Sequence, residues 1–467
     1  MPNHISLGAT PGRTGQSRQK RRWLTLLTLC TAVLIAQVDT SVVNLAVRPI
    51  GNDYHAGVGT LQWVVDSYNL AYAVLLLTGG LLADLYGRRL VFMAGAAIFT
   101  AASLLCAFAP SIMVLIGGRT LAGIGSAMLL PASLAIIRVV WPDEKERGRA
   151  LGTWAACNGL AFVIGPTLGG LLIERFGWRS IFLVVVPFGL AALTLALPFI
   201  SESSDPQDRQ FDAPAQVLGA LALGGLAVAA IESHDATMIA AAALAVATLS
   251  VALFIKVEAK RGVGALVPLD MFRPRAFRGA VAATAGMTFG MYGALFLLPL
   301  TWQSDGHLDA VSAGIALMPM ALVFVLVSPF SGFLTAKLGT RFMTGGGVAV
   351  IGCGLLVIGM TAHSASILAA EIGLALTGFG MGLATGPLMG AAVGAVAAAR
   401  SGTAAALINV ARMAGATIGV AVLGAVFAMG HGGPEGLRLA MLLGGLLQLA
   451  SAAVAWTATR PTAARKP

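Results

Sequence analysis

Two side chains of opposite charge, Asp39 and Arg119, lie deep inside long apolar stretches of the sequence. Ionisable groups in such surroundings cost free energy, so each is a candidate functional residue. An aspartate that is sheltered from water and faced by a guanidinium can take up a proton and release it when its surroundings change. We therefore predict that this pair couples to protons; the alternative is a static ion pair that only neutralises both charges.

A third carboxylate, Asp66, lies near the end of an apolar stretch, beside Trp63 and Tyr68. A carboxylate among aromatic rings suits a lipophilic cation, which gains from both the charge and the ring faces. The alternative is a hydrated charge at the end of a helix. Glu371 is a further candidate for binding substrate or protons, on the same argument from its position in an apolar stretch.

Later in the chain, Arg412 and Asn409 lie within another apolar stretch, and we expect Arg412 to bond other helices or backbone carbonyls rather than substrate. Three aromatic residues recur at near-helical spacing in the stretch from 277 to 300. They could line a cavity, or they could face lipid or neighbouring helices. These residues are Phe289, Tyr292 and Phe296.

A charged turn follows the second apolar stretch and reads Gly-Leu-Leu-Ala-Asp-Leu-Tyr-Gly-Arg-Arg. Its glycines permit a tight turn and close approach of helices. Its charges could form a latch that differs between two conformations and so biases their equilibrium. Anchoring of the topology is the alternative, and the two roles are compatible. The residues of this predicted gating turn are Gly80, Asp84, Gly87, Arg88 and Arg89.

A run of small residues lies within the fifth apolar stretch. Small residues let helix backbones approach, and a proline removes one backbone donor and can bend the helix. The run could therefore seal or pivot the interface between two bundles, although helix packing alone explains it equally well. Its members are Gly159, Gly165, Pro166, Gly169 and Gly170.

The composition identifies the elements that must position these residues. Hydrophobic residues make up 57% of the 467 residues and charged residues 11%, against about 25% charged in an ordinary soluble domain. This excludes a soluble enzyme, a disordered chain and a nucleic-acid-binding domain. The four cysteines lie far apart in apolar runs, which indicates neither disulfides nor a metal site. The chain is therefore predicted to be an all-α membrane protein.

Since a bilayer core requires about 20 apolar residues per helix, we predict fourteen transmembrane helices. The predicted spans are 24–46, 61–83, 90–109, 112–136, 149–172, 180–200, 214–232, 237–256, 277–300, 311–334, 343–361, 366–389, 402–429 and 437–458. With both termini in the cytoplasm, 24 of the 30 Lys and Arg fall on the inside and four on the outside. This is a strong positive-inside signal for a multi-pass protein of the cell membrane.

An internal repeat divides these spans into two sets of six. Gly80 and Gly332 are 252 positions apart, and Gly165 and Gly415 are 250 apart. Transporters use such repeats because two similar bundles can rock about a site at the bilayer midplane. The predicted organisation begins with a basic cytoplasmic tail (1–22) and a first six-helix bundle (23–200). A linker with two inserted helices (201–276) leads to a second, pseudo-symmetric six-helix bundle (277–459), and a cytoplasmic tail (460–467) follows.

Several of these motifs together resemble the major facilitator superfamily. The turn from Gly80 to Arg89 is similar to its loop signature, and the run from Gly159 to Gly170 to its antiporter motif. The stretch 38–46, which includes Asn44, and the stretch 62–68 resemble signatures of the fourteen-helix drug:proton antiporters, the multidrug and quaternary-ammonium exporters. The resemblance implies the two-bundle facilitator fold. It also implies that Asp39 and Arg119 couple proton entry to export of amphipathic, lipophilic or cationic compounds.

The chain departs from the family pattern at three places. The signature of the fourth span usually carries a glutamine directly before its glycine, where this chain has Ala122. A proline usually follows the motif of the first span, where this chain has Arg48, and the thirteenth span lacks the acidic residues of some multidrug relatives. No nucleotide-binding loop or catalytic motif is apparent, so we expect neither an enzyme nor a cofactor, with the proton gradient as energy source. A proton symporter or facilitator for uptake of a small solute is the alternative. We expect a monomer in contact with lipid, protons and a small-molecule substrate, and no nucleic acid.

Overall fold

The structure is a computed structural model, and it describes residues 11–204, 212–233, 236–262, 265, 267–304, 308–364, 367–397 and 400–459. Helices account for nearly all of this part of the chain, and no strand occurs in it. Fourteen segments are long and apolar enough to cross a bilayer, which confirms the predicted number of spans. The predicted tail at 460–467, the first ten residues and most of the linker before the inserted helices lie outside the described residues.

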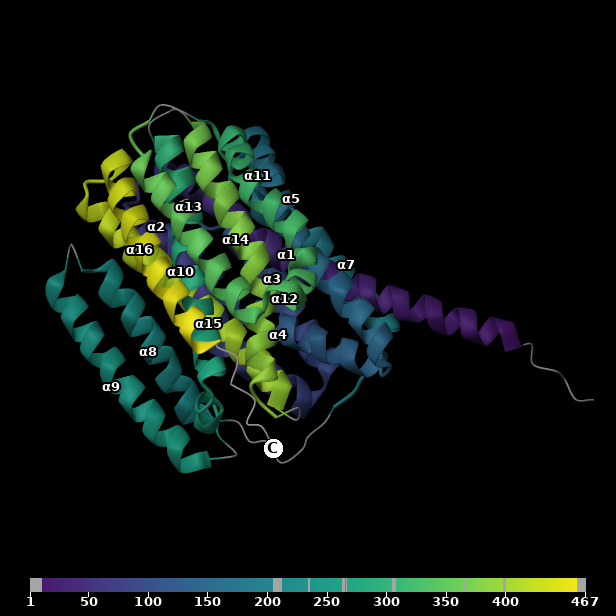
Figure 1. The fold of residues 1–467 in the computed structure, drawn as a ribbon. Coiled ribbons are helices and arrows are strands. Elements are labelled where there is room, and N and C mark those ends of the chain that lie inside the picture. The colour runs from purple at the N-terminus through teal and green to yellow at the C-terminus, as the bar shows by residue number, and fades with distance from the viewer. Residues whose placement is uncertain are drawn as a thin grey trace, which may run out of the picture.

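The helices follow one another through short connections (Figure 1). Three spans are built from two or three consecutive helical pieces: α6 with α7, α11 with η3 and α12, and η4 with α13. The bounds are α1 Pro11–Tyr54, α2 Val58–Tyr86, α3 Arg88–Ala107, α4 Ile112–Val140, α5 Glu144–Phe176, α6 Ser180–Leu183, α7 Val185–Phe199, α8 Ala213–Ile231, α9 Thr237–Arg261, η2 Leu269–Phe272, α10 Arg275–Ser304, α11 Ala310–Val327, η3 Ser328–Phe330, α12 Ser331–Leu338, η4 Phe342–Gly346, α13 Gly347–Met360, α14 Ile367–Gly394, α15 Ser401–Met429 and α16 Gly433–Ala458.

The first helix is much longer than predicted. The sequence analysis treated residues 1–22 as a tail and ended the first span at residue 46, whereas α1 runs from Pro11 through Pro49 to Tyr54. Residues 18–22, directly before Trp23, are arginine, glutamine and lysine, which are good helix formers, so the helix extends beyond the apolar span. A proline inside a membrane helix is tolerated because neighbouring groups satisfy the freed carbonyl. The start of α1 projects away from the bundle (Figure 1).

The same packing recurs in the N-terminal half (α1–α7) and the C-terminal half (α10–α16). In the first, Gly165 of α5 lies directly against Ser41 of α1; in the second, Gly415 of α15 lies against the carbonyl of Ala285 in α10. The turns after the second and tenth spans also match, since Gly87 and Gly339 both adopt positive φ, +115° and +85°. Only glycine adopts such angles readily, so the predicted repeat corresponds to a repeated backbone conformation.

One end of the bundle holds the start of α2 and the end of α1, and we call it the distal end; the opposite end, where α16 finishes, is the terminal end. At the distal end the two halves are joined by hydrogen bonds. Gln62 of α2 donates from Nε2 to the carbonyls of Val420 and Ala421 in α15, at 2.8 and 3.0 Å. Gln303 of α10 donates to the carbonyl of Leu45 in α1 at 3.2 Å. The halves are therefore closed against each other at this end.

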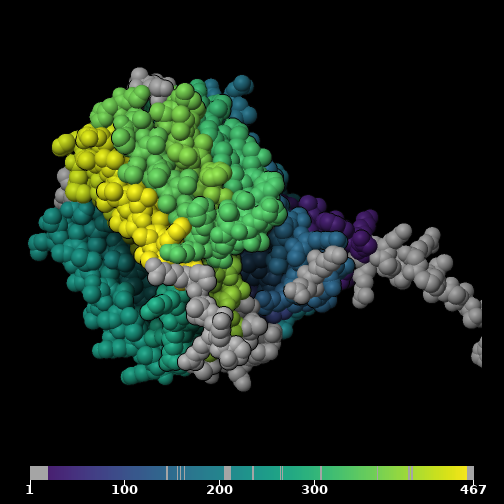
Figure 2. Space-filling model, viewed as in Figure 1, coloured from purple at the N-terminus to yellow at the C-terminus, as the bar shows by residue number. Residues whose placement is uncertain are grey.

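The terminal end is open between the halves. No atom of the described residues lies within 4 Å of a Cβ built on Gly148 or Gly152 of α5, or on Gly390 or Gly394 of α14. The surface is hollowed between the blue N-terminal half and the green C-terminal half towards this end (Figure 2). Small residues that could allow close helix packing thus face open space, and the protein is in a conformation open at the terminal end and closed at the distal end.

The two inserted helices form a hairpin along the outside of the bundle (Figure 1). Helix α8 packs on both α2 and α15. Gln216 fastens it to α2, because its amide oxygen accepts a hydrogen bond from Thr78 Oγ1 and its Nε2 donates to the carbonyl of Val74. Arg261 at the end of α9 pairs with Asp212 at 3.0 Å. The hairpin therefore covers, from the side, the line where the two halves meet at α2 and α15.

Candidate functional site: a buried ion pair between two half-bundles

Asp39 of α1 and Arg119 of α4 form an ion pair inside the N-terminal half. Nη1 of the arginine lies 2.5 Å from Oδ2 of the aspartate, and each side chain is only 2% exposed. The two helices run in opposite directions, and the residues therefore reach the same depth, as their positions along the predicted spans indicated. The pairing is observed; the role of the pair in proton coupling stays a prediction.

The rest of the N-terminal half fixes the guanidinium in place. Arg119 Nε donates to the carbonyl of Val64 in α2 at 3.1 Å. Its guanidinium carbon lies 4.5 Å from the centre of the Tyr68 ring and 6.0 Å from that of Phe182. Tyr68 is held in turn by a 2.7 Å hydrogen bond from its hydroxyl to Ser126 Oγ. Arg119 thus keeps interactions of its own when the carboxylate is neutralised, a requirement for a pair that opens reversibly.

Small residues bring α5 against α1 beside the ion pair. A Cβ on Gly165 would collide with Ser41 Oγ, and one on Gly169 would lie 2.7 Å from Val42. Gly170 instead faces the C-terminal half, where its Cβ would lie 2.7 Å from the carbonyl of Ala310 in α11. Across the same contact, the carbonyl of Pro166 leaves no room for a side chain on Gly314. The predicted antiporter run therefore joins α1 to α11 at the distal end.

Gly159 is the exception in that run. Its nearest neighbour across the gap is Val325 of α11, 3.6 Å from a built Cβ, which is an ordinary contact. It lies nearer the terminal end, where the halves have separated. The glycines of the run thus follow the interface from its closed part to its open part.

The closed contact of Gly170 gives a direct prediction. Gly170→Val should force α5 and α11 apart at the distal end, because backbone atoms of α11 cannot move aside as a flexible side chain could. A cysteine placed at the buried Leu45, in a chain whose four native cysteines are replaced by serine, should then react faster with a membrane-impermeant maleimide. Gly152→Val on the same helix, where space is open, is the control. Equal labelling in both variants would contradict the proposed distal closure.

Asp66 of α2 is wholly enclosed. Its exposed fraction is 0%, and neither carboxylate oxygen has a hydrogen-bond partner among the described residues. This excludes the hydrated helix-end charge that the sequence left open. An ionised carboxylate in such surroundings is expensive. Trp63 is half-buried and Tyr68 faces Arg119, so in this conformation the three residues do not form one aromatic site.

The remaining predicted contact residues occupy different surroundings. Asn44 is buried and donates to the carbonyl of Thr40 at 3.2 Å, while its Oδ1 has no hydrogen-bond partner among the residues described. Glu371 is half-buried. Tyr292 and Phe296 are buried inside the bundle. A single cavity lined by all of them is not observed.

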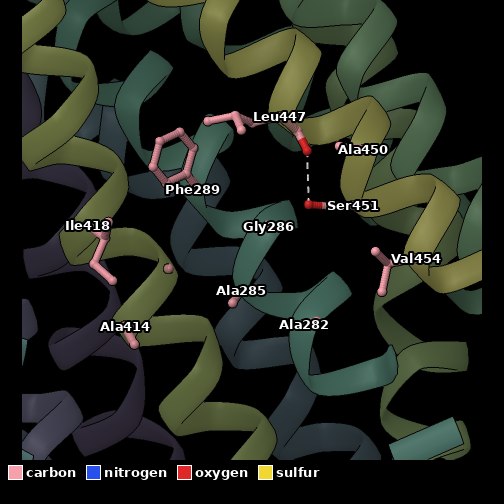
Figure 3. Close-up of a pocket in the computed structure, with 11 residues that line it drawn as sticks. Ala282, Ala285, Gly286, Phe289, Ala414, Ile418, Leu447, Ala450, Ser451 and Val454 are labelled. Atoms are coloured by element: carbon pink, nitrogen blue, oxygen red, sulfur yellow. Dashed lines mark hydrogen bonds between the residues drawn. The ribbon is translucent and has the colours of Figure 1, made fainter. Parts of the chain in front are cut away.

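Phe289 lines a separate groove on the periphery of the C-terminal half, between α10, α15 and α16 (Figure 3). The groove has a volume of about 340 Å³ and is almost entirely apolar. Its one hydroxyl, on Ser451, is already bonded to the carbonyl of Leu447 at 3.0 Å. Leu447 and Val454 on its rim are each 42% exposed, so the groove faces the lipid rather than the interface between the halves. Phe289 thus faces the lipid, which is one of the alternatives that the sequence left open.

At the terminal end, the predicted gating turn is braced by a residue that the sequence analysis missed. Arg88 Nη2 lies 2.9 Å from Asp84 Oδ1. Glu202, in the segment after α7, accepts hydrogen bonds from the backbone N–H groups of Arg89 and Leu90, both at 3.0 Å. It therefore caps α3 at the end where the helix dipole favours a carboxylate. Nothing in the local sequence around Glu202 indicates this role, which depends on how the segment folds back.

Gly80 and Gly87 have different surroundings within that turn. A Cβ on Gly80 would make only an ordinary contact, 3.6 Å from Pro131 of α4. Gly87 combines its positive φ with close contact to Glu202, whose carboxyl carbon would lie 2.8 Å from a Cβ. The turn therefore requires glycine at Gly87. The gating role of the turn stays a prediction.

Comparison with known proteins agrees with this architecture. Residues 29–420 match the family model of the Major Facilitator Superfamily, and the chain belongs to that family. It is 36% identical to the multidrug resistance protein Stp of Mycobacterium tuberculosis over 87% of this chain and 76% of the relative. It is 32% identical to the multidrug efflux pump LfrA of Mycolicibacterium smegmatis (87% and 81%) and 31% identical to a methylenomycin A resistance protein of Bacillus subtilis (98% and 97%).

Proposed function

We propose that this protein is a secondary active exporter that exchanges external protons for amphipathic, drug-like compounds from the cytoplasm. The names of its relatives, efflux pumps and resistance proteins, support export. The observation that carries proton coupling is the enclosed Asp39–Arg119 pair, next to the contact that joins the two halves. The energy source is the proton gradient, without a cofactor, and the functional unit is a monomer in lipid.

The positive-inside distribution of Lys and Arg supports a cytoplasmic terminal end, with both termini on that side. The conformation described above is then open to the cytoplasm. In it, Asp39 is paired with Arg119. In the opposite conformation, which is open to the outside, an external proton neutralises Asp39; this removes most of the attraction to Arg119 and favours a different packing of α1 and α4. Rocking of the two halves then opens the ion pair first to one side of the membrane and then to the other.

Asp66 is a second candidate proton carrier. Because it is enclosed completely, a substrate cannot touch it in the conformation open to the cytoplasm. A neutral acid is the less expensive form of an unpartnered carboxyl group at this depth. Contact with a cationic substrate would require the other conformation, in which α2 and α15 separate.

The test is proton flux in inverted membrane vesicles. A pH gradient established by respiration should partly collapse when a transported compound is added, and vesicles that lack the protein should show no such change. Uptake or symport would instead carry protons and compound in the same direction. Absence of any compound-dependent proton flux, from a protein that is present and folded, would contradict proton exchange.

A further inference from the structure

A second polar cluster lies between the two halves, and the function proposed above does not use it. Tyr72 of α2, Tyr292 of α10 and Arg412 of α15 meet there, and both phenol groups lie within electrostatic reach of the guanidinium. The rings are nearly buried, at 3% and 9% exposure. The three helices come from both halves, so this cluster is reassembled whenever the halves rock.

Among the described residues, no carboxylate pairs with Arg412, and its buried Nε has no hydrogen-bond acceptor. Asp66 lies six residues from Tyr72 on α2, a rise of about 9 Å along the helix, and its carboxylate oxygens likewise have no hydrogen-bond partner in the part of the chain that the structure describes. The expectation that Arg412 bonds another helix is met at Tyr72 of α2, to which it is hydrogen-bonded, whereas its Nε has no acceptor among the described residues. An arginine cannot shed its charge, so an unpaired one within the membrane requires an acceptor from elsewhere.

The surroundings of Arg412 suit an amphipathic molecule. The rings of Tyr72 and Tyr292 offer apolar faces, and the guanidinium offers a planar set of donors that matches a carboxylate. Tyr72 also stacks on Tyr68, with ring centres 6.2 Å apart, and Tyr68 lies under Arg119. A continuous row of side chains thus links this cluster to the Asp39–Arg119 pair. Binding at Arg412 can therefore influence the pair through direct contacts.

We propose that Arg412, flanked by Tyr72 and Tyr292, binds the carboxylate of an amphipathic organic anion, and that such anions are a substrate class of this exporter. The proposal rests on the function proposed above and names its substrate. It follows from the sign of the accessible charge. Arg412 is only half-buried, whereas Asp66 is wholly enclosed, so of these two charges the one that a ligand can reach in this conformation is the cation. The proposed anion differs from the lipophilic cation that the sequence around Asp66 suggests.

A matched series of fluorescent probes tests this proposal. Pyrenebutanoate, pyrenebutanol and pyrenebutyl-trimethylammonium share a ring system and differ in the charge of the head group. Binding to the purified full chain is followed by energy transfer from tryptophan to pyrene. We expect the anion to bind about 10- to 100-fold more tightly than the alcohol, the range for a hydrogen bond to a charged group.

Arg412→Gln should remove this preference, and Arg412→Lys should keep part of it, since lysine retains the charge but not the planar donors. Arg438→Gln is the control, because Arg438 is exposed and pairs with Glu435 near the distal end. If Arg412→Gln does not fold, the head-group preference of the unmodified protein still decides. Equal affinity for the three probes, or tightest binding of the cation, would overturn the proposal.

The binding assay requires no transport, which separates this proposal from the proposed export. A preference for the anion that depends on Arg412 supports the site even where the vesicle assay contradicts proton exchange. Conversely, proton-coupled export of the cationic probe, unchanged by Arg412→Gln, overturns the anion site and leaves the exporter intact.

Discussion

Asp39→Asn is expected to abolish proton-coupled export while the protein remains inserted and folded. Asparagine keeps the shape of the side chain and can still accept a hydrogen bond from Arg119, but it carries no exchangeable acid proton. Without a group that alternates between charged and neutral forms, a proton gradient has nothing to act on at this site. The measurement is compound-dependent collapse of the pH gradient in inverted vesicles, together with drug accumulation in cells.

The matched control is Asp53→Asn on the same helix. Asp53 is an exposed residue near the distal end that pairs with Arg179 at 2.8 Å. Its loss should leave transport close to that of the unmodified protein, because exposed ion pairs contribute little. Exchange of labelled compound between two equal pools, which requires no net proton movement, should survive in Asp39→Asn. Undiminished drug export by this variant would show that another group carries the proton.

Arg119→Leu is expected to have the largest effect on stability. It leaves a carboxylate enclosed without its partner, and breaking a buried pair from one side costs about 3–5 kcal/mol. It also removes the contacts to Val64 and Tyr68 that fix α4 against α2. We expect a lower melting temperature in detergent and loss of export.

The double variant Asp39→Asn with Arg119→Leu distinguishes the pair from its surroundings. If the cost arises from the unpaired carboxylate, the double variant should be more stable than Arg119→Leu alone, because no charge remains buried. Its export should stay absent. Additive losses of stability would instead indicate that the two residues act independently, against the geometry of the pair.

Much of the fold follows from the sequence because the bilayer imposes it. Helix length, apolar content and the distribution of Lys and Arg are each fixed by the membrane, so fourteen spans can be read without knowledge of their packing. The depth of Asp39 and Arg119 follows in the same way, from the rise per residue of two antiparallel helices. Their contact could therefore be anticipated, although the sequence could not choose between a static and a switching pair.

Other parts of the site depend on contacts between distant segments. Glu202 caps α3 only because the chain after α7 returns to that helix. Arg412 meets Tyr72 only because the two halves assemble at α2 and α15. Phe289 and Phe296 share a helical face by spacing, yet one lines a lipid-facing groove and the other is enclosed. Periodicity identifies a face, but the neighbouring helix determines what that face touches.

Proton release on substrate binding tests the central claim most directly. Purified protein in weakly buffered detergent solution, mixed with a saturating amount of a transported compound, should release protons that a pH indicator records. Asp39→Asn should still bind the compound but release fewer protons than the unmodified protein, because the proton that Asp39 carries is missing. If the variant binds the compound and releases the same number of protons, Asp39 is not the exchanging group and the mechanism is wrong.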